Sequence, residues 1–369
     1  MVVTWRVDIV WDLINISVST NDGASMKAYV IHGPKDLRID ERTERDLAAD
    51  EVRLGLAYGG ICGSDMHYYQ DGKVGHSIVR DPMVLGHELA ALVLEVGQDV
   101  KDVSVDDRVA INPSLPCGTC IMCQQGEENV CFNMKYLGSA AKQPHTHGAF
   151  EERPVVKDHQ CVVLPSNANL KLAALAEPYA IALHAANLGE VAGKRVLVTG
   201  AGTIGTLAAV AALDQGASEV FVSDVHQAAL ERVRKLADVQ TLTAKAVEEF
   251  VDSGEDKFFD VVLEASGAPQ AFNTALKVLI PKGRLIQVGF LAPAELDMNL
   301  ILTKELTVKG AYRFLNEFEK AVESVLAKPE LLGAVSATYE FGVADEAFES
   351  SLDKQKHLKV MIQNENYAS

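Results

Sequence analysis

The chain has 369 residues, of which 48% are apolar and 23% are charged, with a formal net charge of −17. This length predicts two domains with a large buried core. The acidic balance argues against nucleic acid or a membrane surface as partner, and no run of eighteen apolar residues indicates a transmembrane helix.

The six cysteines lie in a long chain without the features of a secretory signal, since Asp8 and Asp12 interrupt the first apolar stretch. Cysteines of a reducing compartment serve more often as metal ligands than as disulfides. We therefore expect a cytoplasmic protein with metal-binding thiols.

The first part of the chain is rich in predicted strands. Residues 1–25 are a leader, either an edge strand or a disordered segment, and Met26 opens a clean strand pattern. Short strands separated by Gly, Pro and Asp turns are predicted up to Pro165, and this spacing indicates a compact β-barrel-like domain. Their ranges are 27–31, 51–57, 88–96, 108–111 and 161–164.

A helix is predicted over residues 170–188, with a kink at Pro178 in its middle. From Arg195 to about Gly310 the chain alternates apolar strands with helices, which predicts a parallel sheet covered on both faces. An amphipathic helix at 315–327 opens a tail that we expect to return to the first domain.

The segment 59–88 contains a thiol, Cys62, and ends in the sequence Gly86-His87-Glu88. Zinc takes sulfur, imidazole nitrogen and carboxylate oxygen, and a catalytic zinc keeps one position open. Glycines beside Cys62 and His87 would let the backbone pass close to a metal or substrate. The alternative is a buried thiol and an unrelated histidine. Between the two candidate ligands lie groups able to pass a proton: Ser64, His67 and Tyr68.

A glycine-rich turn follows the strand predicted at 196–199 and precedes a helix at 207–214. In that context the glycines permit a tight turn and the approach of a pyrophosphate to the helix N-terminus. The second strand ends at Asp224, where a carboxylate can accept hydrogen bonds from a ribose, so NAD is favoured, with NADP possible because His226 and Arg232 are near. The alternative is a structural glycine turn of another α/β fold. The candidate cofactor residues are Gly200, Gly202, Thr203, Ile204, Gly205 and Asp224, together with Gly267 and Gly289 after two later strands.

Four further cysteines lie close together, spaced C-x2-C-x2-C-x7-C: Cys117, Cys120, Cys123 and Cys131. Four thiolates make a closed tetrahedral zinc site that holds a loop, and an iron–sulfur cluster is the alternative. Cys161 is expected to be a buried core thiol. For Glu177, a solvated helix carboxylate is the plain alternative to a role in the site.

Together these residues resemble the zinc-dependent medium-chain dehydrogenase/reductase superfamily from Met26 onward. The segments CGSDMHYY (62–69) and GKVG (72–75), and the pair Glu177-Pro178, resemble its polyol dehydrogenase branch. The segments 110–118 and 138–145 resemble the L-idonate 5-dehydrogenases more narrowly.

The resemblance implies a β-rich GroES-like catalytic domain, 26–177 and 311–369 with a zinc lobe at about 113–150, and a doubly wound Rossmann cofactor domain, 178–310. It implies that Cys62 and His87 bind the catalytic zinc directly and that Glu88 and Glu177 complete the shell, one of them through water. Ser64 and His67 would relay the proton, while Tyr68 and Arg313 would hold the substrate.

The function expected from this resemblance is the NAD-linked oxidation of a secondary hydroxyl of a sugar acid, of the L-idonate to 5-keto-gluconate type, and the reverse. A sorbitol or xylitol dehydrogenase is the alternative, and a nicotinamide-binding sensor without activity is a remote one. The expected partner is therefore a small sugar acid or polyol. The superfamily also implies a homo-oligomer, a dimer or tetramer.

Overall fold

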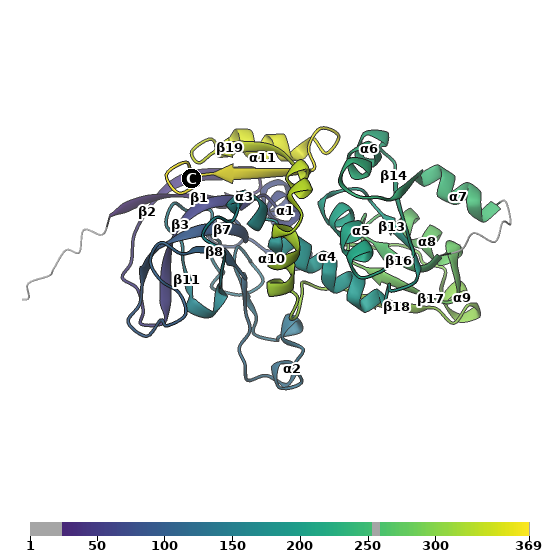
Figure 1. Cartoon of the computed structure of the whole chain (residues 1–369), viewed down its shortest axis with the longest axis horizontal. Coiled ribbons are helices and arrows are strands. Elements are labelled where there is room, and N and C mark those ends of the chain that lie inside the picture. The colour runs from purple at the N-terminus through teal and green to yellow at the C-terminus, as the bar shows by residue number, and fades with distance from the viewer. Residues whose placement is uncertain (1–23, 253–258, 369) are drawn as a thin grey trace, which may run out of the picture.

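The computed structural model describes residues 24–252 and 259–368. It has a β-rich half, which contains both ends of the described chain, and a half built on a parallel sheet (Figure 1). The predicted leader lies outside the described residues except for its end, where Ser25 opens β1 (Ser25–Gly33).

The β-rich half is centred on β3 (Glu51–Gly60), whose residues are buried along almost the whole strand. Six strands are hydrogen-bonded in the order β12-β8-β7-β3-β20-β19, and β11 also pairs with β3. Val52, Leu54 and Leu56 alternate with Glu51, Arg53 and Gly55, yet both sets are buried, so both faces of β3 are covered. The other strands of this sheet are β7 (Glu88–Val96), β8 (Arg108–Ile111), β11 (Val155–Lys157), β12 (Cys161–Val163), β19 (Val335–Glu340) and β20 (Lys359–Gln363).

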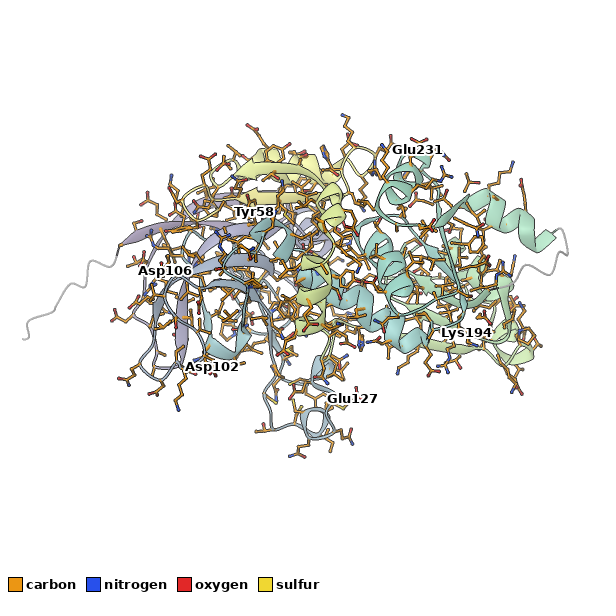
Figure 2. The ribbon with its side chains drawn as sticks, in the orientation of Figure 1. Tyr58, Asp102, Asp106, Glu127, Lys194 and Glu231 are labelled. Carbon is orange, nitrogen blue, oxygen red and sulfur yellow. The ribbon has the colours of Figure 1, made fainter. Side chains whose placement is uncertain are left out.

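Smaller elements surround this sheet. β1 pairs with β2 (Asp36–Thr43) and β6 (Met83–Val84), while β4 (Lys73–Val74) pairs with β5 (Ser77–Ile78). The cysteine-rich segment forms a lobe that projects away from both sheets, where Glu127 is labelled in Figure 2. The elements of this lobe are β9 (Ser114–Leu115), α2 (Ile121–Gln124), η1 (Glu128–Val130) and β10 (Lys135–Tyr136).

The C-terminal segment adds its strands to the first sheet. β20 pairs antiparallel with β3, with Met361 opposite Gly60, and β19 pairs parallel with β20. The remaining elements of this half are α1 (Gly63–Asp71), η2 (Asp158–Gln160), α3 (Leu170–Ala173), α10 (Phe318–Leu326), η3 (Pro329–Ala334) and α11 (Ala344–Leu352).

The helix predicted over 170–188 is two helices, α3 and α4 (Ala176–Gly189). The predicted kink at Pro178 is wrong, because Pro178 lies in the first turn of α4. There its missing N–H and fixed φ cost little, since the first N–H groups of a helix have no intrahelical partner. The break instead falls at Ala174 and Leu175.

The second half is a parallel sheet with strand order β15-β14-β13-β16-β17-β18. Alternate residues of β13 pack into two different apolar clusters: Val196 and Val198 lie with α4 and α5, and Leu197 with α7 and α8. The predicted coverage of both faces is thus confirmed. The elements are β13 (Arg195–Thr199), α5 (Thr203–Asp214), β14 (Glu219–Asp224), α6 (Gln227–Leu236), β15 (Gln240–Thr243), α7 (Ala244–Asp252), β16 (Phe259–Glu264), α8 (Pro269–Val278), β17 (Leu279–Gln287), α9 (Met298–Thr303) and β18 (Thr307–Gly310).

Across residues 24–252 and 259–368, no helix has the length and apolar character needed to span a membrane.

One testable feature of the fold is the start of β3. Arg45 donates two hydrogen bonds to the Glu51 carboxylate, at 2.6 and 3.0 Å, and the Ala48 amide donates a third at 2.9 Å. The Arg45 bonds are the largest cause that lowers the pKa of Glu51 to about 2, against the opposing effect of burial.

We expect Glu51→Gln to lower the free energy of unfolding at pH 7 by about 1 kcal/mol. The effect is this small because Arg45 is exposed and water screens its attraction to Glu51. Since the folded pKa lies below the unfolded value, the contribution is complete above the unfolded pKa and is lost as pH falls toward 2. Denaturant unfolding at pH 7 and pH 3 should therefore show a smaller difference at pH 3. Asp36→Asn, which removes an ion pair with Arg38 on the protein surface, is the control and should have little effect.

Candidate active site

Cys62 lies between the end of β3 and the start of α1. Asp65, in the first turn of α1, is completely buried. One carboxylate oxygen of Asp65 accepts a hydrogen bond from the Cys62 amide (2.9 Å), and the other accepts one from the Gly86 amide (3.2 Å). Asp65 thereby ties the loop that carries Cys62 to the loop that carries His87. Its Oδ1 also lies 3.8 Å from His87 Nδ1.

Glycine is required where the two loops approach each other. Gly86 has φ +93°, and a Cβ there would lie 2.2 Å from the Phe150 ring. A Cβ on Gly60 would lie 2.1 Å from Glu88 Oε2. These contacts support the prediction that glycine lets the backbone pass close to the candidate ligands.

Cys62, His87 and Glu88 come together, with one ligand atom from each lying within 4.8 Å of the others. The Glu88 carboxylate is already paired, however, because Lys359 Nζ donates to its two oxygens at 2.8 and 2.7 Å. Lys359 also donates to the Ile61 carbonyl at 3.0 Å. Burial alone would lower the pKa of Lys359, but Glu88 outweighs this and holds it above its usual value.

Glu177 is the second candidate carboxylate, in the first turn of α4, and it is almost completely buried. Its Oε1 accepts a hydrogen bond of 2.5 Å from the Tyr136 hydroxyl. Its Oε2 has no hydrogen-bond partner among the described residues. Burial raises the pKa of Glu177 to about 7, while His87 opposes this shift and Glu88 adds to it. The plain alternative of a solvated helix carboxylate is thus wrong.

The donor set fits a zinc ion. It offers one thiol, one imidazole and two carboxylates, which are the ligand types of catalytic zinc. The buried Oε2 of Glu177 lacks a hydrogen-bond partner among the described residues. A buried polar atom without a partner is costly, and a cation would satisfy such atoms.

The other predicted site residues of this half lie on α1 and before α10. Ser64 and His67 are one turn apart on α1, and His67 Nδ1 lies 3.3 Å from Asp71 Oδ2. The buried Tyr68 hydroxyl accepts a hydrogen bond from the Ala140 amide at 3.0 Å. Arg313 has a left-handed backbone, φ +58°, and makes no hydrogen bond or ion pair with the described residues.

The cofactor residues lie at the carboxyl ends of the parallel strands. Gly200 has φ +91° after β13, and a Cβ on Gly205 would lie 1.7 Å from the Gly200 carbonyl oxygen. Gly267 and Gly289 are in contact, because a Cβ on Gly289 would lie 2.5 Å from the Gly267 amide. Gly202 is the N-cap of α5, followed by Thr203 and Ile204.

Asp224 ends β14 as predicted, and its two oxygens accept hydrogen bonds from the Ala201 and His226 amides, both at 2.7 Å. Arg232 lines the same cavity as Asp224, and its guanidinium donates to the carbonyls of Lys354 and Gln355 in the loop before β20. These bonds hold the Arg232 guanidinium against the opposite half of the protein.

A cavity of about 780 Å³ runs between the two halves. It is lined by Gly200, Asp224 and the α5 N-terminus on one side, and by Cys62, His67 and Glu88 on the other. A ligand that fills it would contact both the glycine-rich turn and the candidate zinc residues. This proximity is what hydride transfer between a bound substrate and a dinucleotide requires.

The four remaining cysteines form a second cluster, as predicted. Three of the distances between their sulfurs are 3.6, 3.8 and 3.5 Å. Four sulfurs placed about 2.3 Å from one zinc stand about 3.8 Å apart, whereas an iron–sulfur cluster puts several atoms between them. The cluster therefore fits a single ion. Cys161 is half-buried rather than fully buried, so the predicted core thiol lies at the edge of its cluster.

The matches to known proteins agree with this arrangement. Residues 48–166 match the alcohol dehydrogenase GroES-like domain, and residues 203–327 match the zinc-binding dehydrogenase family. The chain is 38% identical to L-idonate 5-dehydrogenase (NAD(P)(+)) of Escherichia coli over 340 residues, which are 91% of this chain and 98% of that protein. The chain belongs to the zinc-dependent medium-chain dehydrogenases.

It is similarly related to sorbitol dehydrogenase of Bacillus subtilis, with 31% identity over 92% of this chain and 97% of that one. The crystal structure of the Escherichia coli L-idonate 5-dehydrogenase superposes with a TM-score of 0.87 at 36% identity, covering 92% of this chain and 98% of that one. This medium-chain dehydrogenase is thus an oxidoreductase of the polyol and sugar type, and its cofactors are zinc and NAD(P).

Sequence reasoning missed three residues of the site. Asp65 follows Cys62 by three positions at a helix start, which is the spacing of a capping box and was a usable signal. Lys359 stands directly before the apolar run 360–362, where a charge that is buried needs a partner. Tyr136 gave no local signal, because its partners Glu177 and Arg313 are distant in sequence.

We expect Cys62→Ser to lose one zinc per chain and nearly all turnover, while the zinc of the four-cysteine cluster remains. Metal analysis of the purified protein measures this directly. Cys161→Ser, outside both clusters, is the control and should keep two zincs. A Cys62→Ser protein with two zincs and full turnover would contradict the assignment.

Lys359→Met should lower the free energy of unfolding by about 3–5 kcal/mol, because it leaves the Glu88 carboxylate buried without its partner. Adding Glu88→Gln should recover most of the loss by removing the unpaired charge. Denaturant unfolding of the chelator-treated proteins separates this effect from metal binding. Equal stability of the single and double variants would show that the pair is not coupled.

Proposed function

We propose that the protein oxidises a secondary hydroxyl of a sugar acid, of the L-idonate to 5-keto-gluconate type, with NAD as acceptor, and catalyses the reverse reaction. We prefer a sugar acid to a neutral polyol as the substrate because of the Arg313 guanidinium. It lies beside the candidate zinc site without a carboxylate partner among the described residues. A guanidinium recognises a carboxylate through two parallel hydrogen bonds.

In this proposal Cys62 and His87 hold the zinc, and Glu177 supplies the third protein ligand through its unpartnered Oε2. Glu88 takes the outer position, because Lys359 already occupies both of its oxygens. A bound zinc would act as a Lewis acid that lowers the pKa of the substrate hydroxyl, and a bound nicotinamide would take the hydride.

The chain's own residues then manage the proton and the substrate. Ser64 Oγ receives the proton of the hydroxyl, and His67, half-exposed on the same helix at the cavity, passes it toward solvent. No hydrogen bond joins the two side chains directly, so a ribose hydroxyl or water must bridge them. Tyr68 binds a substrate hydroxyl, and Arg313 binds the carboxylate.

A sorbitol or xylitol dehydrogenase is the second candidate, and the similarity to the Bacillus subtilis sorbitol dehydrogenase favours it. A neutral polyol leaves Arg313 with only hydroxyl partners. A sensor that kept the fold and lost the chemistry is less well supported, because the Cys62 thiol, the His87 imidazole and the Glu88 carboxylate have ligand atoms within 4.8 Å of one another. We also propose a homo-oligomer in the cytoplasm, in which the exposed edge strand β18 is available for pairing.

The decisive experiment is a steady-state comparison of L-idonate, sorbitol and xylitol with NAD and NADP, with and without chelator. We expect the highest kcat/KM on L-idonate with NAD and its loss with chelator. Equal or better turnover of the neutral polyols would remove the sugar-acid proposal in favour of the second candidate.

Arg313→Met should raise the KM for the acid by about 10- to 100-fold, since a charge-assisted bidentate contact is lost. The KM for a neutral polyol should change by less than about threefold, because hydroxyl contacts are weaker. The ratio of the two KM values is the measurement. A parallel rise in both would show that Arg313 supports the fold of the site rather than the carboxylate.

A further inference from the structure

Tyr136 lies where the candidate zinc site meets the proposed carboxylate-binding arginine. It is the second residue of β10 in the cysteine lobe, and it is buried. Its hydroxyl donates to Glu177 Oε1 at 2.5 Å. Its ring centroid lies 4.2 Å from the Arg313 guanidinium and 5.7 Å from the His87 ring. One rigid side chain therefore touches three groups of the site.

The first contact fixes a carboxylate. A tyrosine hydroxyl has one proton to donate, and that of Tyr136 is directed at Glu177 Oε1. Because this bond sets the rotation of the carboxyl group, it also sets the direction of Oε2, which is buried and has no partner among the described residues. Groups that hold a metal-ligating carboxylate in this way strongly affect metal affinity.

The second contact fixes a cation. The Arg313 guanidinium contacts two aromatic rings, with its central carbon 4.2 Å from the centroid of Tyr136 and 4.7 Å from that of Tyr312. Stacking leaves the N–H donors in the guanidinium plane free, because the ring faces offer no lone pairs in that plane. The backbone is held as well, since the buried Asn129 amide donates to the Tyr312 carbonyl at 3.1 Å.

The Arg313 backbone is in the left-handed region, at φ +58°. A residue other than glycine adopts this conformation at a cost, and such residues concentrate at functional sites. The strained backbone and the two rings thus hold the Arg313 guanidinium in one position, and neither ring carries a negative charge that could pair with it.

We propose that Tyr136 is a positioning and specificity-determining residue that couples the two ends of the substrate site. Its hydroxyl holds Glu177 for the metal, and its ring presents Arg313 to the substrate's carboxylate. The rigid phenol fixes the separation between the metal shell and the guanidinium. It therefore selects acids whose carboxylate stands at a matching distance from the hydroxyl to be oxidised. The second half of this inference rests on the proposed function.

Two variants separate the two contacts. Tyr136→Phe removes the hydroxyl and keeps the ring, so the catalytic zinc should be held about 10- to 100-fold more weakly. The ratio of the KM values for L-idonate and sorbitol should stay within about twofold of the wild-type ratio, because the stacking remains. Tyr136→Leu removes both groups, and it should also raise that ratio by about 3- to 30-fold.

Zinc affinity is measured by competition with a chromophoric chelator, using Cys62→Ser to identify the signal of the four-cysteine cluster. Arg313→Met is the matched control, because it should change the KM ratio and leave zinc affinity unchanged. Binding of NADH, followed by its fluorescence, verifies that each variant is folded.

Unchanged zinc affinity in Tyr136→Phe would overturn the role of the hydroxyl, and an unchanged KM ratio in Tyr136→Leu would overturn the role of the ring. If the wild-type protein oxidises neither compound, the proposed function fails. The zinc measurement on Tyr136→Phe still decides the first half of the inference in that case.

Discussion

The site depends on a single carboxylate, that of Asp65, which accepts hydrogen bonds from the amides of two separate loops. The pairing of β3 with β7, which sets Gly60 opposite Glu88, brings these loops together. Asp65 then ties the thiol at the start of α1 to the loop of the imidazole before β7. Because Asp65 is completely buried, each bond forms away from competing water and holds its loop more firmly than a surface contact would. These two bonds, together with the strand pairing, hold Cys62 and His87 in position.

A second constraint is the charge balance around the candidate metal. The site places a thiol and three buried carboxylates in a small volume, and each resists burial in its charged form. Lys359 neutralises one carboxylate, Glu88, and the Tyr136 hydroxyl supports another, Glu177. The two glutamates therefore have different environments: one is matched by a protein cation, and the other retains an unpartnered oxygen. This difference is the physical reason to assign them different roles.

Much of the fold could be predicted from sequence because its signals are local. The glycine-rich turn between β13 and α5 needs only neighbouring residues, and so does the short cysteine spacing. The effect of Pro178 was predicted wrongly because the start of α4 was not known. A proline is tolerated in the first turn of a helix but disrupts the middle of one. The partners of Glu88, Glu177 and Arg313 could not be found this way. Each is a single side chain brought close by tertiary packing, and no spacing rule relates Glu88 to Lys359.

The antiparallel pairing of β20 with β3 has a consequence for how the protein is made. A ribosome releases β3, α1 and the His87 loop long before β20 exists, and the whole parallel sheet lies between them in sequence. Sheets that depend on such distant partners assemble late and slowly. Until β20 is synthesised, Glu88 lacks its lysine, so there is a period in which this carboxylate has no counterion and its burial would be costly. A metal that arrives during this period meets a different set of charges from that of the finished enzyme.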